Sequence, residues 1–278
     1  MDIELAAVSA LESLLALCDG IKSHINEYDK EPIWDGNIYV YEKDAYKTEN
    51  MLGRVPVQIK GKKIANSSTI TCLTYQVKVS ELNHYLNDGG VFYFVVAIFD
   101  QKKTIFYKAL LPYELKCILK NIEKEKTKSI TLAKMPNNID SVKQLFRNFI
   151  TDRKLQYPLI TMTEEDIEKA LRHNVVDYKI YFEPEKIIDS HSEYLKELSS
   201  QPFYIYAKTQ NGTLIPCDYY DPSQKFIADK LNLPVYVNGK KYFDYCFERY
   251  EQGKRFISIG TVCKLPWPDK DINVKKSN

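Results

Sequence analysis

Residues 89–100, GGVFYFVVAIFD, carry the strongest strand signal in the chain. Valine, isoleucine and aromatic residues dominate this stretch, and these residue types favour β-strands. Its apolar residues do not alternate with polar ones, which is typical of a strand that is buried on both faces. We therefore predict a central strand in a sheet that is covered on both sides.

Helix and strand patterns flank this stretch on both sides. A short helix is expected just before it, with Ser80 as N-cap, and a neighbouring strand, TIFYKALL (104–111), just after it. Pro112 suits the first turn of a further helix. Such a mixture predicts an α/β or α+β fold in which helices flank a mixed sheet.

Upstream, the sequence predicts one helix and three strands. The helix covers residues 3–18, which are rich in alanine and leucine, and the strands are WDGNIYVYE (34–42), RVPVQIKG (54–61) and TCLTYQVKV (71–79). With the central strand and its neighbours, these elements are enough for one complete layered domain.

Three segments are expected along the chain. Residues 1–155 should form the first domain, residues 160–265 a smaller, β-rich α+β domain, and residues 266–278 a tail or linker. Short aromatic strands mark the second domain, and Asn238-Gly239 between two of them predicts a two-residue hairpin turn.

The composition of the 278 residues limits the class of protein. A net charge of +2 gives no general attraction for nucleic acid, so any basic surface has to be local. Six scattered cysteines without a CxxC pair predict free thiols in a reducing compartment. The acidic start and the lack of an apolar run of about 18 residues predict neither a signal peptide nor a membrane span. We expect a cytoplasmic protein.

One predicted strand carries two polar residues that share a face. Gln58 and Lys60 are two residues apart, and Asp35 opens the preceding strand, which can bring its carboxylate beside them. Carboxylate and amide oxygens can hold a hard divalent cation, Mg²⁺ or Mn²⁺, which polarises a phosphate and activates a bound water. A lysine can stabilise charge that develops on phosphate oxygens. The three residues therefore predict phosphodiester cleavage.

These residues also resemble a known superfamily. Asp35, followed by Gln58-Ile59-Lys60 and preceded by a helix with Glu12, is similar to the pattern of PD-(D/E)XK nucleases. More narrowly, residues from about 10 to 120 resemble the uncharacterised family "domain of unknown function 4365" through WDGNIYV, VPVQIKG, LNHYLNDGGVFYFVV and FYKALLPYELK.

The resemblance implies a restriction-endonuclease-like fold and metal-dependent cleavage of nucleic acid, most often DNA, in prokaryotic genome defence. It implies that Asp35 is the metal carboxylate and Lys60 the lysine of the motif. Gln58 stands where Glu or Asp is usual, and Glu12 is a candidate for the missing carboxylate, with Glu4 on the same helix as its competitor. Because a neutral amide gives a metal less charge, the alternative is an inactive nuclease-like fold that binds nucleic acid or protein.

Partner contacts are expected in two places. Arg54, Lys62 and Lys63 are either a solvated edge or contacts to phosphates beside the site. DNA is the expected partner, with RNA as the alternative. The C-terminal half is a candidate for binding a protein partner or a second copy of the chain.

Overall fold

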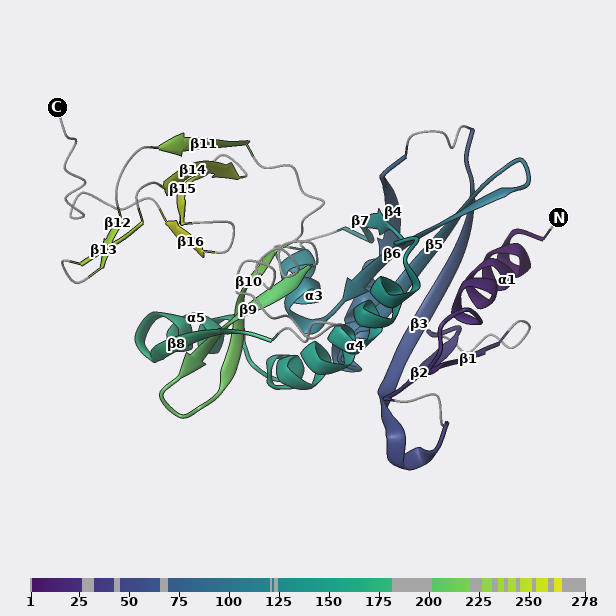
Figure 1. Cartoon of the computed structure of the whole chain (residues 1–278), viewed down its shortest axis with the longest axis horizontal. Helices are drawn as coiled ribbons and strands as arrows, with labels where there is room; N and C mark the ends of the chain where they lie inside the picture. Colours follow the sequence, from purple (N-terminus) through teal and green to yellow (C-terminus); the bar gives the residue numbers. More distant parts are fainter. Residues whose placement is uncertain are drawn as a thin grey trace. The chain divides into compact units, whose positions relative to one another are not determined.

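The structure is a computed structural model (Figure 1). It describes residues 2–26, 33–42, 46–65, 70–120, 122, 125–181 and 202–220, and beyond them the backbone of strands β11 to β16 defined below. The chain divides into two compact units, one formed by Met1–Glu185 and Tyr204–Asp218, the other by Lys186–Phe203 and Tyr219–Asn278. Among the described residues, no helix is long and apolar enough to cross a membrane.

The main sheet of the first unit has seven strands. They are β1 (Ile21–Ile25), β2 (Gly36–Tyr41), β3 (Met51–Lys63), β4 (Cys72–Lys78), β5 (Val91–Phe99), β6 (Lys102–Leu110) and β7 (Thr127–Lys134). Their order is β1-β2-β3-β5-β6-β7-β4. Only β3 and β5 pair in parallel; the other neighbours are antiparallel. This confirms the expected mixed sheet.

Helices cover both faces of this sheet. They are α1 (Ile3–Leu15), α2 (Val79–Asn87), α3 (Pro112–Leu119) and α4 (Ile139–Gln156), with short 3-10 turns η1 (Thr48–Asn50) and η2 (Tyr157–Ile160). Pro112 lies in the first turn of α3 as expected. The expected N-cap Ser80 is wrong, because α2 already begins at Val79 and Ser80 lies inside its first turn.

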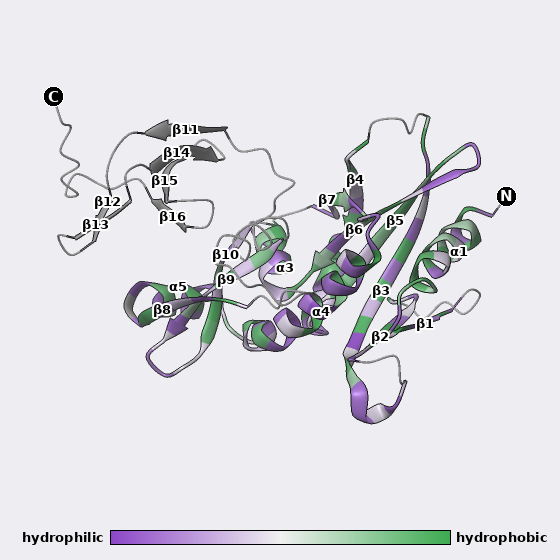
Figure 2. Cartoon of the chain, viewed as in Figure 1, coloured by the Kyte–Doolittle hydropathy of each residue, from purple (hydrophilic) through white to green (hydrophobic). Residues whose placement is uncertain are grey.

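The central position predicted for β5 is confirmed. Eight of its nine residues are buried, and successive side chains point to opposite faces of the sheet and pack against different helices. Tyr93 belongs to a buried cluster with Tyr85 of α2 and Leu115 of α3. On the other face, Phe92 packs against two phenylalanines of α4, Phe146 and Phe149, with ring centroids 5.0 and 5.7 Å apart. β3 has a more alternating character, visible as changing green and purple bands in Figure 2.

A smaller three-stranded sheet follows α4. It is preceded by α5 (Glu164–His173) and consists of β8 (Val175–Ile180), β9 (Phe203–Thr209) and β10 (Leu214–Tyr220), in the order β10-β9-β8. Thr163 is the N-cap of α5 and forms a capping box with Asp166, so the helix begins directly after it.

The remaining strands are short and antiparallel. They are β11 (Ile227–Leu231), β12 (Val235–Val237), β13 (Lys240–Phe243), β14 (Cys246–Glu251), β15 (Lys254–Ile259) and β16 (Cys263–Pro266). They form a four-stranded sheet, β11-β14-β15-β16, and the pair β12-β13. The Asn238-Gly239 turn itself and residues 267–278 lie outside the described part of the chain.

The boundary expected between residues 155 and 160 does not coincide with the two compact units, since the first unit extends to Glu185 and takes in Tyr204–Asp218. Hydrogen bonds explain the difference: Asp152 of α4 accepts one from Tyr206 of β9 at 2.6 Å. The small sheet is therefore attached to the helix layer of the main sheet, although the sequence changes character between them.

Candidate active site

Strand pairing brings Asp35 to the middle of β3. Gly36 pairs with Val57, and Asp35 N donates a hydrogen bond to Val57 O at 3.0 Å. Oδ2 of Asp35 then accepts hydrogen bonds from Gln58 Nε2 and from Ile59 N, both at 2.6 Å. The prediction that the two strands place Asp35 beside Gln58 is confirmed.

Gly36 makes this close approach possible. Its φ is 149°, and a Cβ atom at this position would collide with the backbone carbonyl of His24 in β1. Any larger residue would therefore push β1 and β2 apart next to Asp35. The Asp-Gly pair thus fixes the carboxylate at the start of β2.

Gln58 is held from two sides. Its side chain is buried, with 5 % exposed, and its Oε1 accepts a hydrogen bond from Tyr85 Oη at 3.2 Å. Tyr85 lies on α2 and is itself fully buried. The amide therefore directs its nitrogen to Asp35 and its oxygen to Tyr85.

Lys60 lies on the same face of β3, two residues further on, and is partly buried. Its positive charge lowers the pKa of the Asp35 carboxyl group, so the two side chains interact electrostatically. None of the described residues forms a hydrogen bond or an ion pair with its ammonium group. An ammonium group at this position, beside Asp35, can interact with an anionic group such as a phosphate.

Asp35 lies among further acids. Burial raises the pKa of its carboxyl group, the Ile59 N–H and Lys60 act in the opposite direction, and Glu4 and Glu81 raise it again. Glu4 lies in the first turn of α1 and Glu81 in the first turn of α2, where Lys78 pairs with it at 3.7 Å. The local excess of negative charge favours a bound cation.

The structure distinguishes the two acids of α1. The start of α1 packs on β3, because a Cβ atom at Gly61 would collide with Ile3. Glu4 is next to this contact and acts on Asp35, whereas Glu12 is not among the charges that do so. Eight residues of helix separate the two acids by about 12 Å. The role of Glu12 stays a prediction, and Glu4 is the better-placed acid.

The three residues of β3 that were predicted to contact phosphates beside the site, Arg54, Lys62 and Lys63, are not equivalent. Arg54 and Lys62 share the face of Lys60, while Lys63 points to the opposite face. Lys62 Nζ donates to Thr74 O at 3.3 Å and lies 5.9 Å from the centre of the Tyr75 ring. Arg54 is exposed. Arg54, Lys60 and Lys62 thus form a line of cations along one side of β3.

The side chains fit a divalent cation only in part. No group of three or more His, Cys, Asp or Glu side chains in the described ranges is close enough to hold a metal ion. Asp35 keeps its Oδ1 without a hydrogen bond from the described residues, and Glu4 and Glu81 add negative charge. Gln58 can offer its carbonyl oxygen beside Asp35 only if its amide group turns over.

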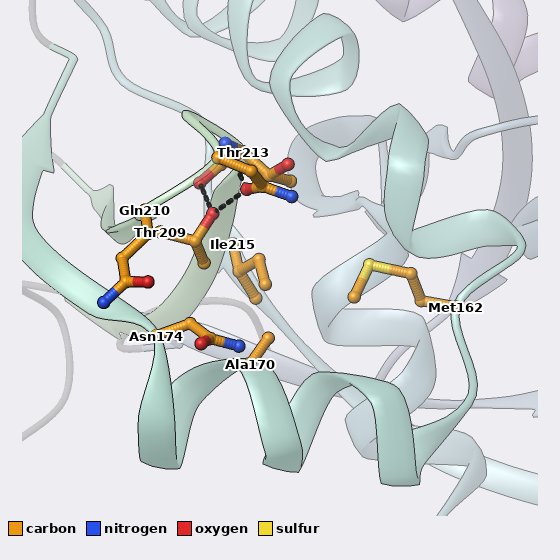
Figure 3. Close-up of a pocket in the computed structure, with 8 residues that line it drawn as sticks. Met162, Ala170, Asn174, Thr209, Gln210, Thr213 and Ile215 are labelled. Carbon is orange, nitrogen blue, oxygen red and sulfur yellow. Dashed lines mark hydrogen bonds between the residues drawn. The ribbon is translucent and has the colours of Figure 1, made fainter.

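A hollow of about 250 Å³ lies away from this site, between α5 and the turn that joins β9 to β10 (Figure 3). Apolar and amide side chains line it, among them Met162, Ala170, Asn174, Gln210 and Ile215. Thr209 is also there, but its hydroxyl donates to Thr213 O at 3.0 Å within the turn. Every side chain that lines this hollow is uncharged, so it offers no group for phosphoryl chemistry.

Two residues of the site were not singled out from the sequence. Glu81 and Tyr85 are four residues apart on α2 and therefore project from the same side of the helix. This spacing was visible in SELNHYL, but the sequence does not tell which strand that side of the helix covers.

Comparisons of the chain with models of protein families, with curated proteins and with solved structures find no match.

Proposed function

We propose that this chain is a metal-dependent nuclease that hydrolyses phosphodiester bonds of nucleic acid, with DNA as the expected substrate, in prokaryotic genome defence. The observation that carries the proposal is that the pairing of β2 with β3 brings Asp35 beside Gln58, with Lys60 on the same face of β3. The mixed sheet between two helix layers is consistent with the restriction-endonuclease-like fold that the PD-(D/E)XK resemblance implies.

Each residue has a part in this proposal. Asp35 would hold Mg²⁺ or Mn²⁺ through its carboxylate, helped by the negative charge of Glu4 and, after reversal of its amide, by the Gln58 carbonyl. A bound cation supplies a polarised phosphate and a water of lowered pKa. Lys60 stabilises the negative charge that develops on the phosphate oxygens. Arg54 and Lys62 contact phosphates on either side along the strand.

The test is cleavage of plasmid DNA and of single-stranded DNA and RNA, with Mg²⁺, with Mn²⁺ and with a chelator. Lys60→Ala should reduce the rate roughly 10²–10³-fold through loss of one electrostatic contact. Lys63→Ala is the matched control, because Lys63 follows on the opposite face of β3 and should leave the rate unchanged. Equal rates for Lys60→Ala and the wild type would end the assignment at this site.

A second candidate is a nuclease-like domain that binds nucleic acid or protein without cutting. The orientation of Gln58 favours it, because the amide donates to Asp35 with its nitrogen and so occupies the carboxylate that a metal would need. This candidate predicts binding that does not depend on divalent cations and no cleavage in any of the three assays. The wild type alone therefore separates the two candidates.

A further inference from the structure

Asp152 is a buried carboxyl group away from the candidate active site. It lies near the end of α4, is 8 % exposed, and accepts a hydrogen bond from Tyr206 Oη at 2.6 Å. Tyr206 is fully buried on β9, the middle strand of the three-stranded sheet. The proposed nuclease chemistry gives this pair no role.

The surrounding contacts join three elements. Gln156, one turn further along α4, donates with Nε2 to Tyr206 Oη at 3.3 Å and accepts with Oε1 from Tyr113 N of α3 at 3.0 Å. The Tyr181 ring meets the Tyr206 ring edge-on, with centroids 5.7 Å apart. The two hydrogen bonds of Tyr206, to Asp152 and from Gln156, exist only while β9 stays against α4.

No cation compensates Asp152 among the described residues. Charged side chains lie on the elements packed around Asp152, and none of those described forms an ion pair with it. They include Arg153 and Lys154 of α4, Glu114 and Lys116 of α3, and Lys179 and Lys208 of the small sheet. Arg153 bonds to Asp88, Lys154 to the Leu52 carbonyl, Lys116 to the Met162 carbonyl, and Glu114 pairs with Lys108.

Burial therefore dominates the titration of this carboxyl group. It raises the pKa of Asp152 to about 7, and the hydrogen bond from Tyr206 acts in the opposite direction without restoring the usual value. The carboxyl group changes its charge in a range that cells experience.

We propose that Asp152 is a pH-dependent latch between α4 and the three-stranded sheet. The neutral carboxyl group holds Tyr206 and keeps β9 against α4, and the ionised carboxylate, buried without a cation, favours release of the sheet. β10 pairs with β9, so the latch sets how firmly β9 and β10 stay attached to α4.

The direction of the effect follows from proton binding. The closed form binds a proton that the open form, with an ordinary aspartate pKa of about 4, has released. Raising the pH from about 4 to about 7 therefore favours opening, nearly tenfold for each pH unit, and above about 7 the effect levels off. Between pH 5 and pH 8 the opening equilibrium should rise roughly 100-fold.

Amide hydrogen exchange on the full chain tests the latch. Protection factors of β9, taken relative to those of β3 and β5 in the same molecule, should fall between pH 5 and pH 8. Asp152→Asn keeps an oxygen acceptor for Tyr206 but stays neutral, so its β9 protection should remain at the low-pH level throughout. Asp140→Asn, an exposed acid in the first turn of α4, is the matched control and should behave like the wild type.

Two results would overturn the proposal. One is a wild-type β9 whose protection relative to β3 and β5 does not change between pH 5 and pH 8, which needs no variant to fold. The other is an equal fall in the wild type and in Asp152→Asn, which would assign the pH dependence to another group.

Discussion

At the scale of single residues, the Gln58 amide takes the place of a charge. Its N–H donates to the half-buried Asp35 carboxylate at 2.6 Å and so offsets part of the cost of burying it. A glutamate at this position would bring a second carboxylate to the same place, and two like charges at this distance raise each other's pKa unless a cation lies between them.

Gln58→Glu should therefore make the stability of the protein depend on divalent cations. In a chelator, the loss of a hydrogen bond to a charged group should cost roughly 1.5 to 3 kcal/mol, and Mn²⁺ should restore much of it. Thermal unfolding with chelator and with increasing Mn²⁺ measures this. Gln76→Glu, on the exposed side of β4, is the control that should show neither effect. A loss that Mn²⁺ does not reduce would speak against a cation at Asp35.

Tyr85→Phe isolates the second contact of Gln58. The change keeps the buried ring and removes only the hydroxyl that donates to Gln58 Oε1. A buried acceptor without its donor should lower the free energy of unfolding by about 1 to 3 kcal/mol. Tyr75→Phe, on a partly buried tyrosine of β4, should cost less than the Tyr85 variant, and urea unfolding compares them. Equal losses would mean that the Tyr85 hydroxyl does not hold the amide.

At the scale of elements, the contact between α1 and β3 decides which acid of α1 takes part. Glu4 is next to the Ile3–Gly61 contact and raises the pKa of Asp35, so removing its charge should lower that pKa. The same negative charge attracts a cation bound at Asp35.

Glu4→Gln should weaken Mn²⁺ binding by about 1 kcal/mol, which is roughly fivefold in Kd. Glu12→Gln, two turns further along the same helix, should leave the Kd unchanged, and calorimetric titration of both variants measures the difference. If instead only Glu12→Gln weakened Mn²⁺ binding, Glu12 would be the metal-binding acid of α1, as the superfamily resemblance implies.

The elements also show how far sequence reasoning reaches. β5 could be predicted because its nine residues carry an almost unbroken apolar signal, and Asp35 could be placed beside Gln58 because β2 and β3 are consecutive strands that pair. β1 was not predicted, since its five residues hold only two apolar side chains. β4 pairs with β7 at the far edge of the sheet rather than with β3, and such long-range pairing depends on tertiary packing that local patterns do not contain.

At the scale of the whole molecule, the small sheet belongs to the first unit although its aromatic strands resemble β11 to β16 in sequence. The candidate site residues lie in α1, α2 and β3, with Asp35 directly before β2, and none lies in the small sheet. A truncation can therefore change stability without touching the site.

A fragment of residues 1–220 should be more stable than one of residues 1–155. The shorter fragment loses the buried ring of Tyr206 and the Gln156 side chain that accepts from Tyr113 N, so buried surface of α3 and α4 becomes exposed. Burial of a large aromatic side chain contributes roughly 1.5 to 3 kcal/mol, so the urea midpoint of 1–155 should lie clearly lower. Tyr206→Phe in the longer fragment keeps the ring and loses only the hydroxyl, so it should fall between the two. Equal midpoints for both fragments would instead place the domain boundary where the sequence alone puts it, between residues 155 and 160.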